Sequence, residues 1–143
     1  LAEIVEAAQS PVLVFYRYRF EVEMIEEALA RQYRVRRCDG DADVVAWNAG
    51  DVDVLLAYPA SVAYGLNMQA GGHYIVWTSL GWDLEQYLQA NARLHRQGQR
   101  QTVHVYRLVA RGTVDERAVA ALARKDGSQR AMLDALKMMS DID

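Results

Sequence analysis

Gln89, Arg93 and Arg96 are the residues whose types and spacing most suggest chemistry. The segment from Asp83 to Arg96 has the periodicity of one helix, with Asp83 placed to cap its start and Gly98 placed to end it. In such a helix the three side chains cluster within about 60° of one another. They lie opposite an apolar stripe of Leu84, Tyr87, Leu88 and Leu94. Because neighbouring arginines repel each other, this face favours an anion such as a triphosphate. A solvated basic face is the alternative interpretation.

The stretch from Gln89 to Gln99 also matches a known pattern. It reads Q-A-N-A-R-L-H-R-Q-G-Q, and it fits every fixed position of Q-A-x-x-R-x-H-R-x-G-Q. This stretch resembles motif VI of the SWI/SNF-type ATPases of helicase superfamily two. The residues that follow, Thr102–Val109 and Gly112–Glu116, resemble the strand and closing helix that come after this motif in the family.

Upstream segments extend the resemblance to almost the whole chain. Val12–Tyr16 resembles the motif IV strand, Leu55–Gln69 resembles motif V, and Trp82 stands where the family has a tryptophan before motif VI. Pro59–Ala63 departs from the family's usual Thr-Arg-Ala-Gly-Gly, so this loop should be stiffer. The interval after the second predicted strand is shorter than in chromatin remodellers, which suggests a compact bacterial or phage-type member.

The resemblance implies roles for residues at two places. Arg93 and Arg96 would be arginine fingers that reach the γ-phosphate of ATP, which together with Mg²⁺ would be bound mainly by a first RecA-like lobe. Such a positioned guanidinium speeds phosphoryl transfer by roughly 10³ to 10⁵. The residues that would line the same cleft are Gly65, Asn67 and Gln89, and those that would contact duplex DNA are Arg17, Arg19, Ser61 and Trp82.

Simpler interpretations stay open for several of these residues. Gly65 could be only a turn former and Asn67 a local cap, while Arg17 and Arg19 could be a solvated pair. Trp82, like Trp77, could belong to the core.

The sequence lacks the motifs that bind a nucleotide by themselves. It contains no G-x-x-x-x-G-K-[S/T] loop, and no Asp-Glu pair follows a predicted strand. We therefore expect the chain alone to be inactive as an ATPase. No metal site is predicted, because His73, His95 and His104 lack partners at useful spacing. The single cysteine, Cys38, is expected to be a small buried residue.

Alternating strands and helices must position these residues. Strands are predicted at Val12–Tyr16, Tyr33–Arg37, Val52–Ala57, His73–Thr78 and Thr102–Leu108. Besides the helix at Asp83–Arg96, helices are predicted at Glu21–Arg31, at Val44–Asn48, from a capping box at Thr113 through Arg124, and at Ser128–Met139. This order predicts an α/β RecA-like fold of three layers, with a mostly parallel central sheet and helices on both faces. Ligands of such sheets bind at the carboxyl ends of the strands.

Composition sets further limits. The 143 residues are 52% hydrophobic and 24% charged, as expected for one globular domain over residues 1–143. The net charge of −3 indicates that any contact with DNA is local. No apolar run approaches the roughly 18 residues that a membrane span needs, so we expect a cytoplasmic protein. We also expect the chain to be a fragment of a longer two-lobe protein.

The leading hypothesis is therefore the second lobe of an ATP-dependent DNA translocase of the SWI/SNF type. One alternative is the corresponding lobe of a strand-separating helicase. Another is an interaction module that has a RecA-like fold without catalysis. A dinucleotide-binding Rossmann domain is excluded because G-x-G-x-x-G does not occur.

Overall fold

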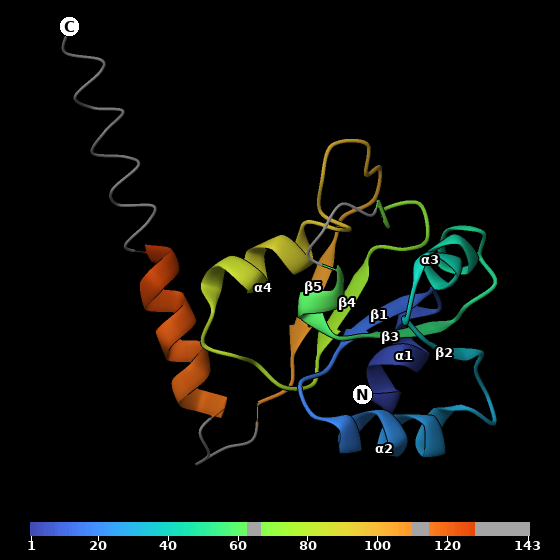
Figure 1. Ribbon diagram of the computed structural model, residues 1–143, viewed down its shortest axis with the longest axis horizontal. Coiled ribbons are helices and arrows are strands. Elements are labelled where there is room, and N and C mark those ends of the chain that lie inside the picture. The colour runs from blue at the N-terminus through green and yellow to red at the C-terminus, as the bar shows by residue number, and fades with distance from the viewer. Residues whose placement is uncertain (63–66, 110–114, 128–143) are drawn as a thin grey trace, which may run out of the picture.

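Five parallel strands form the centre of the protein, as a computed structural model shows for residues 1–62, 67–109 and 115–127 (Figure 1). The strand order is β2-β3-β1-β4-β5, so β1 lies in the middle of the sheet. The strands are β1 (Val12–Phe15), β2 (Val35–Arg37), β3 (Val54–Ala57), β4 (Tyr74–Trp77) and β5 (His104–Arg107). The helices are α1 (Ala2–Ala8), α2 (Arg19–Leu29), α3 (Asp41–Asn48) and α4 (Leu84–Asn91), with a 3-10 helix at Pro59–Val62 and a further helical segment at 115–127.

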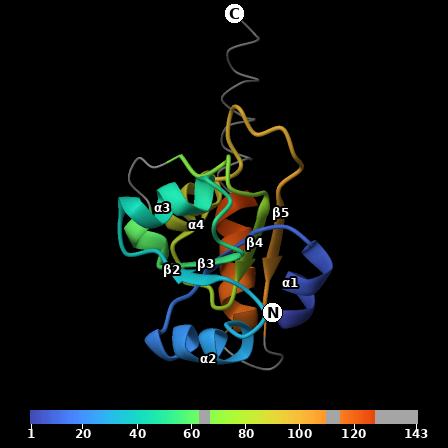
Figure 2. The same ribbon diagram turned by 90° about the vertical axis from the view of Figure 1, so that its right-hand side faces the viewer.

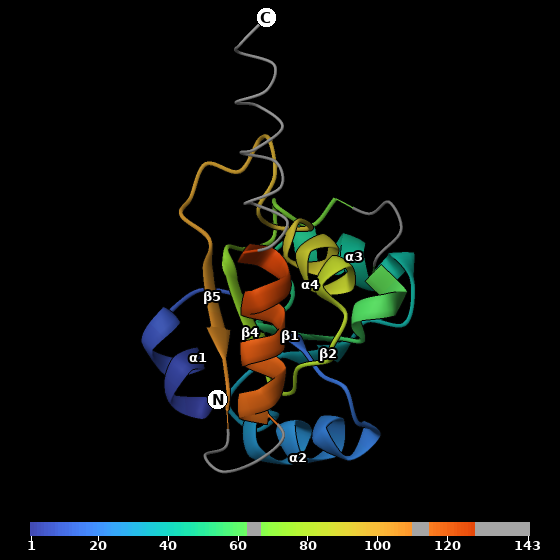
Figure 3. The same ribbon diagram turned by 90° about the vertical axis from the view of Figure 1, so that its left-hand side faces the viewer.

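Helices cover both faces of the sheet, which confirms the predicted three-layer α/β fold. Alternate residues of β1 divide between two cores: Leu13 and Phe15 pack with α3 and α4, whereas Val12 and Val14 pack with α1 and α2. Figures 2 and 3 show α1 and α2 lying away from α3 and α4. Because all four of these residues are fully buried, β1 is the unbroken apolar run that a central parallel strand requires.

The five predicted strands are present, and four of the predicted helices differ in extent. The helix predicted at Glu21–Arg31 is α2, which spans Arg19–Leu29. The helix predicted at Val44–Asn48 begins earlier, as α3, because the Asp43 carboxylate accepts hydrogen bonds from the backbone N–H groups of Asp39 and Gly40. The helix predicted through Arg124 continues through residue 127, while its capping residue, Thr113, lies outside the described residues. The segment predicted at Ser128–Met139 also lies outside them.

No secondary structure is predicted for the first eleven residues, although α1 lies there. Only Val5 of this short helix is fully buried, so its amphipathic pattern is weak. Gln9 ends α1 with a left-handed backbone, φ 46°, and the chain then enters β1. Burial of Val5 against Val12, Val14 and their neighbours therefore supports a helix that local sequence does not reveal.

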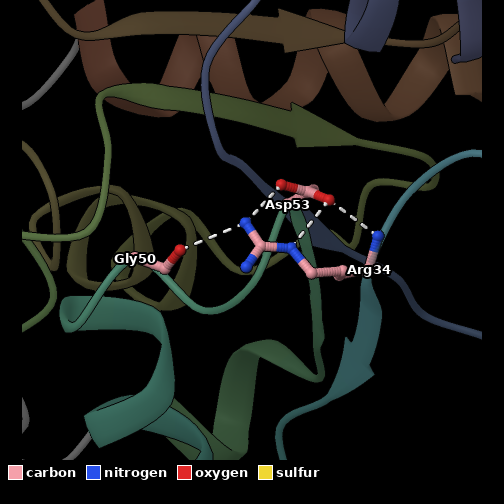
Figure 4. A network of polar contacts seen from close by, with 3 residues as sticks. All are labelled: Arg34, Gly50 and Asp53. Atoms are coloured by element: carbon pink, nitrogen blue, oxygen red, sulfur yellow. Dashed lines mark hydrogen bonds and ion pairs between the residues drawn. The ribbon is translucent and has the colours of Figure 1, made fainter.

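An ion pair joins the amino ends of β2 and β3 (Figure 4). Asp53 accepts hydrogen bonds from the backbone N–H of Arg34 at 2.7 Å and from its guanidinium at 2.9 and 3.2 Å. The same guanidinium also donates to the carbonyl of Gly50. The hydrogen bonds from Arg34 lower the pKa of the Asp53 carboxyl below its ordinary value. This network holds the short edge strand β2 in register with β3.

Candidate nucleotide and DNA interfaces

The residues predicted to bind ATP or DNA form two groups, one beyond the carboxyl ends of the parallel strands (the carboxyl edge) and one beyond their amino ends (the amino edge). Arg17, Arg19, Ser61 and Trp82 follow the carboxyl ends of β1, β3 and β4. Asn67, Arg93 and Arg96 lie in the connections that lead back to the amino ends of β4 and β5. Gly65 lies outside the described residues. The motif VI arginines therefore lie at the amino ends of the strands, opposite the carboxyl ends at which the sequence predicts ligand binding.

Motif VI is only partly helical. Asp83 caps α4 as predicted, since its Oδ1 accepts the backbone N–H of Gln86 at 3.0 Å. The helix ends at Asn91, however, and the predicted extension to Arg96 is wrong. The carbonyls of Arg93 and Leu94 instead accept hydrogen bonds from the Met68 backbone N–H and from the Gln99 side chain. One distant partner, Met68, and one nearby side chain, Gln99, thus take the place of helical donors to these two carbonyls.

The shorter helix changes which side chains share a face. Gln89 is exposed on α4, where its amide donates to the carboxylate of Glu85 at 3.1 Å. Leu88 was predicted to face the core but is 41% exposed, whereas Leu94 is fully buried beyond the end of the helix. Gln89 therefore does not share one continuous helical face with Arg93 and Arg96.

The two arginines nevertheless influence each other. Arg93 is half-buried and Arg96 is exposed. Burial lowers the pKa of the Arg93 guanidinium below its ordinary value, and the positive charge of Arg96 lowers it further. Arg96 lines an open hollow of about 580 Å³ with residues of the turn that precedes β5. The two cationic side chains of motif VI therefore lie close enough to affect each other's charge.

Side chains from α3 anchor the end of motif V beside motif VI. The Trp47 indole N–H donates to the carbonyl of Met68 at 2.9 Å, and the Asn48 amide donates to the carbonyl of Asn67 at 2.8 Å. The backbone N–H of Met68 in turn donates to the carbonyl of Arg93 at 3.3 Å. Asn67, predicted to contact ATP, is exposed and is held here through its backbone.

The side chain of Gln99 also connects the end of motif V to motif VI. Its Nε2 lies 3.1 to 3.2 Å from the carbonyl oxygens of Gln69, Gly72 and Leu94. No role is predicted from the sequence for Gln99 or Trp47, although Gln99 is the last fixed position of the matched motif. The match at this motif position could have identified Gln99 from the sequence. Nothing in the sequence identifies Trp47 beyond its apolar character.

At the carboxyl edge, Arg17 lies next to the turn after β4. Its Nη1 donates to the carbonyl of Leu80 at 3.2 Å. A pocket of about 170 Å³ lies beside it, lined among others by Tyr58 and Trp82. Trp82 is 44% exposed and so is not the core residue of the simpler interpretation, whereas Trp77, at 2%, is. Arg17 and Trp82, predicted from separate motifs, are thus brought together.

The other two candidate DNA contacts lie at the same edge. Arg19 is exposed at the first residue of α2. The Ser61 hydroxyl donates to the carbonyl of Tyr58 at 2.7 Å within the 3-10 helix that replaces the family's glycine-containing loop. Ser61 is exposed, so one of its lone pairs is open to solvent.

Among residues 1–62, 67–109 and 115–127, no group of three or more histidine, cysteine or acidic side chains could hold a metal ion. Over the same residues, no helix has the length and apolar character to cross a membrane. Cys38 is half-buried against the core rather than fully buried as expected, and burial raises the pKa of its thiol to about 11.

Comparisons of sequence find relatives that the chain covers only in part. The chain is 33% identical over 138 residues to putative protein p41 of Acyrthosiphon pisum secondary endosymbiont phage 1, with 92% of the chain and 29% of the relative covered. It is 30% identical over 142 residues to DNA repair and recombination protein RAD54B of Mus musculus, with 92% and 16% covered. It is 30% identical over 131 residues to chromatin-remodeling ATPase INO80 of Homo sapiens, with 85% and 8% covered. The chain thus spans less than a third of each of these relatives.

Comparison of structures points to the same kind of domain. The crystal structure of the C-terminal part of the Fun30 ATPase domain superposes with a TM-score of 0.71 at 18% identity, covering 83% of this chain and 40% of that one. No family model matches the sequence. Over most of its length the chain is therefore similar in sequence to SWI/SNF-type ATPases, and it shares the fold of the C-terminal part of such an ATPase domain.

Proposed function

We propose that residues 1–143 form the second lobe of an ATP-dependent DNA translocase. In this proposal the amino edge of the sheet closes on ATP held by a first lobe, while the carboxyl edge contacts duplex DNA. Two relatives support the proposal by their names, one a DNA repair and recombination protein and the other a chromatin-remodeling ATPase. Cycles of closure would then move the protein along DNA.

The observation that carries the proposal is the pair of arginines at the amino edge. Arg93 is half-buried beside the positive charge of Arg96, an arrangement that disfavours its own charged state. A polyphosphate placed against this edge would reverse that effect, because guanidinium groups bind phosphate oxygens with a planar, bidentate geometry. In the transition state of phosphoryl transfer, the same groups would stabilise the charge that spreads over the equatorial oxygens. Gly65, Asn67 and Gln89 are proposed to line the same cleft.

The donors of this edge suit ATP but not its metal ion. Arginine and amide groups match phosphate oxygens, whereas Mg²⁺ prefers carboxylate and water oxygens. The described residues offer no acidic cluster for a metal ion. Mg²⁺ and most of the contacts to ATP are therefore assigned to the first lobe, and this chain alone should not hydrolyse ATP.

The carboxyl edge is proposed to contact DNA through a few residues only. Arg17 and Arg19 would approach the phosphates, and Trp82 would pack against the backbone. The Ser61 hydroxyl would donate to a phosphate oxygen only by giving up its hydrogen bond to the Tyr58 carbonyl. The net charge of −3 argues against electrostatic binding of DNA by the whole surface of the protein. Binding should then be weak and strongly dependent on salt.

The test replaces Arg93 or Arg96 by alanine in the full-length protein that carries this chain. Each variant should lose roughly 10³- to 10⁵-fold in DNA-stimulated ATP turnover, because the loss of an arginine finger has that size. Lysine should restore little, because it lacks the planar fork. Arg124, exposed on the helical segment 115–127, provides the matched control, and its alanine variant should keep normal turnover. Turnover above about a tenth of the wild-type value in either variant would show that the replaced arginine is not a finger, because loss of a finger has a much larger effect.

A further inference from the structure

Exposed aromatic side chains gather at the carboxyl edge of the sheet. Tyr18 is 46% exposed, Phe20 59%, Tyr58 45% and Trp82 44%. Among the described residues only one other aromatic side chain, Tyr106 on β5, is comparably exposed, at 40%. The first four lie just after the ends of β1, β3 and β4, so segments far apart in the sequence bring them to one edge. Folding normally buries such rings, and a cluster of exposed ones marks a binding surface.

Tyr18 and Phe20 form a stacked pair at the start of α2. Their ring centroids are 5.6 Å apart and their planes differ by only 12°. The Arg17 guanidinium lies 5.6 Å from the centroid of the Tyr18 ring, so Tyr18 is the more enclosed of the two. Phe20, the more exposed ring, is therefore the one that offers a flat face to a ligand.

Positive charge alternates with these rings in the sequence Tyr16-Arg17-Tyr18-Arg19-Phe20. The nearest acid, Glu21, is already engaged, because its carboxylate accepts the backbone N–H groups of Arg17 and Tyr18 and the hydroxyl of Ser79. These donors are uncharged, so Glu21 keeps its negative charge, and Arg17 and Arg19 leave a net charge of about +1 at the start of α2. The exposed acids Glu23 and Glu27 lie further along the helix, so a phosphate chain is favoured on the arginine side.

We propose that this surface, defined by Tyr18 and Phe20 with Arg17 and Arg19, binds an unpaired nucleobase of single-stranded DNA by stacking. The proposal rests on the DNA-binding role proposed above and names a second form of DNA for the same edge. Duplex DNA hides the faces of its bases, and its phosphates bind hydrogen-bond donors that a phenylalanine ring lacks. A single strand exposes both base faces and phosphates, which match stacked aromatic rings flanked by arginines.

The test compares single-stranded and duplex binding in the full-length protein that carries this chain. Tyr18→Ala and Phe20→Ala are titrated with a fluorescent oligothymidine and with a blunt duplex at one salt concentration. Each variant should bind the single strand roughly 5- to 150-fold more weakly, the range that one lost stacking contact produces. Affinity for the duplex and duplex-stimulated ATP turnover should change by less than about twofold.

Two further variants separate stacking from other effects. Phe20→Leu keeps an apolar side chain without a flat ring, so its affinity for the single strand should fall as that of Phe20→Ala does. Phe20→Trp keeps a flat ring and should retain the wild-type affinity. Tyr106→Ala, which removes an exposed tyrosine from β5, should bind both forms normally. An oligonucleotide that carries 5-iododeoxyuridine should photo-crosslink to Phe20, because this base reacts with rings that it stacks on.

The outcomes are distinguishable. Equal losses on single strand and duplex, or no loss in either alanine variant, would overturn the stacking proposal while the translocase proposal stands. Crosslinks that map only to residues outside this surface would overturn it as well. Absence of any DNA binding by the wild-type protein would refute the proposed function itself.

Discussion

Gln99 should couple the stability of this lobe to the placement of Arg96. Its side-chain nitrogen lies within 3.2 Å of three carbonyl oxygens, two before β4 and one in motif VI, and its own oxygen accepts the backbone N–H of Gln101. The backbone N–H of Gln99 also donates to the carbonyl of Arg96 at 3.1 Å. Replacement by methionine keeps the length and volume of the side chain but removes every one of its polar contacts.

The expected loss of stability follows from these contacts. A primary amide has two N–H hydrogens, so it can make at most two full bonds to the three oxygens. With the bond from Gln101, about three hydrogen bonds are lost, each with a net value of about 0.5 to 1.5 kcal/mol. Gln99 is half-buried, so water can satisfy part of what is lost. We therefore expect Gln99→Met to lower the free energy of unfolding by about 1 to 3 kcal/mol, which lowers Tm by roughly 3 to 10 °C.

Activity should fall by more than stability explains. A turn that no longer holds Arg96 in place misdirects the guanidinium, and a displacement of about 1 Å at such a group can cost roughly a hundredfold in rate. The assay measures thermal unfolding and DNA-stimulated ATP turnover of Gln99→Met in the full-length protein, below its Tm. Gln97→Met, at an exposed glutamine of the same turn, is the control and should change neither quantity. If Gln99→Met unfolds and turns over ATP like the wild-type protein, the three carbonyl contacts do not hold motif VI, and our reasoning is wrong.

Three further predictions address the rest of the lobe. Gly71→Ala should destabilise the protein by more than about 1 kcal/mol in urea unfolding, because a methyl group there would lie 2.2 Å from the indole nitrogen of buried Trp47; an unchanged midpoint would show that the loop can move aside. Asp53 has a pKa below its ordinary value of 3.8 owing to Arg34, so its contribution to stability is present above that pH and is lost as pH falls through the lowered pKa. Asp53→Asn should therefore be less stable at neutral pH and less sensitive to acid, and an identical acid transition would contradict this. Because the pKa of Cys38 is about 11 against an ordinary 9.0, its alkylation at pH 8 should be roughly a hundredfold slower than in the unfolded chain, and equal rates would mean that the thiol is not shielded.

The sequence was sufficient for the fold class and for the identity of the candidate residues. Strands such as β1 and β3 are continuous apolar runs because both of their faces are buried, and a helix cap such as Asp83 acts within three residues. Features of this kind depend on neighbours in the sequence, so they can be read before folding. Arg93 and Arg96 were identified differently, through the resemblance of Gln89–Gln99 to a family motif.

Only the tertiary structure decided where those residues lie and what surrounds them. Three features depend on partners distant in the sequence. They are the end of α4 at Asn91, the position of the arginines at the amino edge, and the contact of Arg17 with the turn after β4. The hydrogen bond from Met68 to Arg93 spans 25 residues, and no local periodicity encodes such a contact. The four exposed aromatic rings likewise come from three separate connections. Parallel strands bring the ends of distant segments to one edge, and for that reason the group of exposed aromatic rings became visible only in the folded chain.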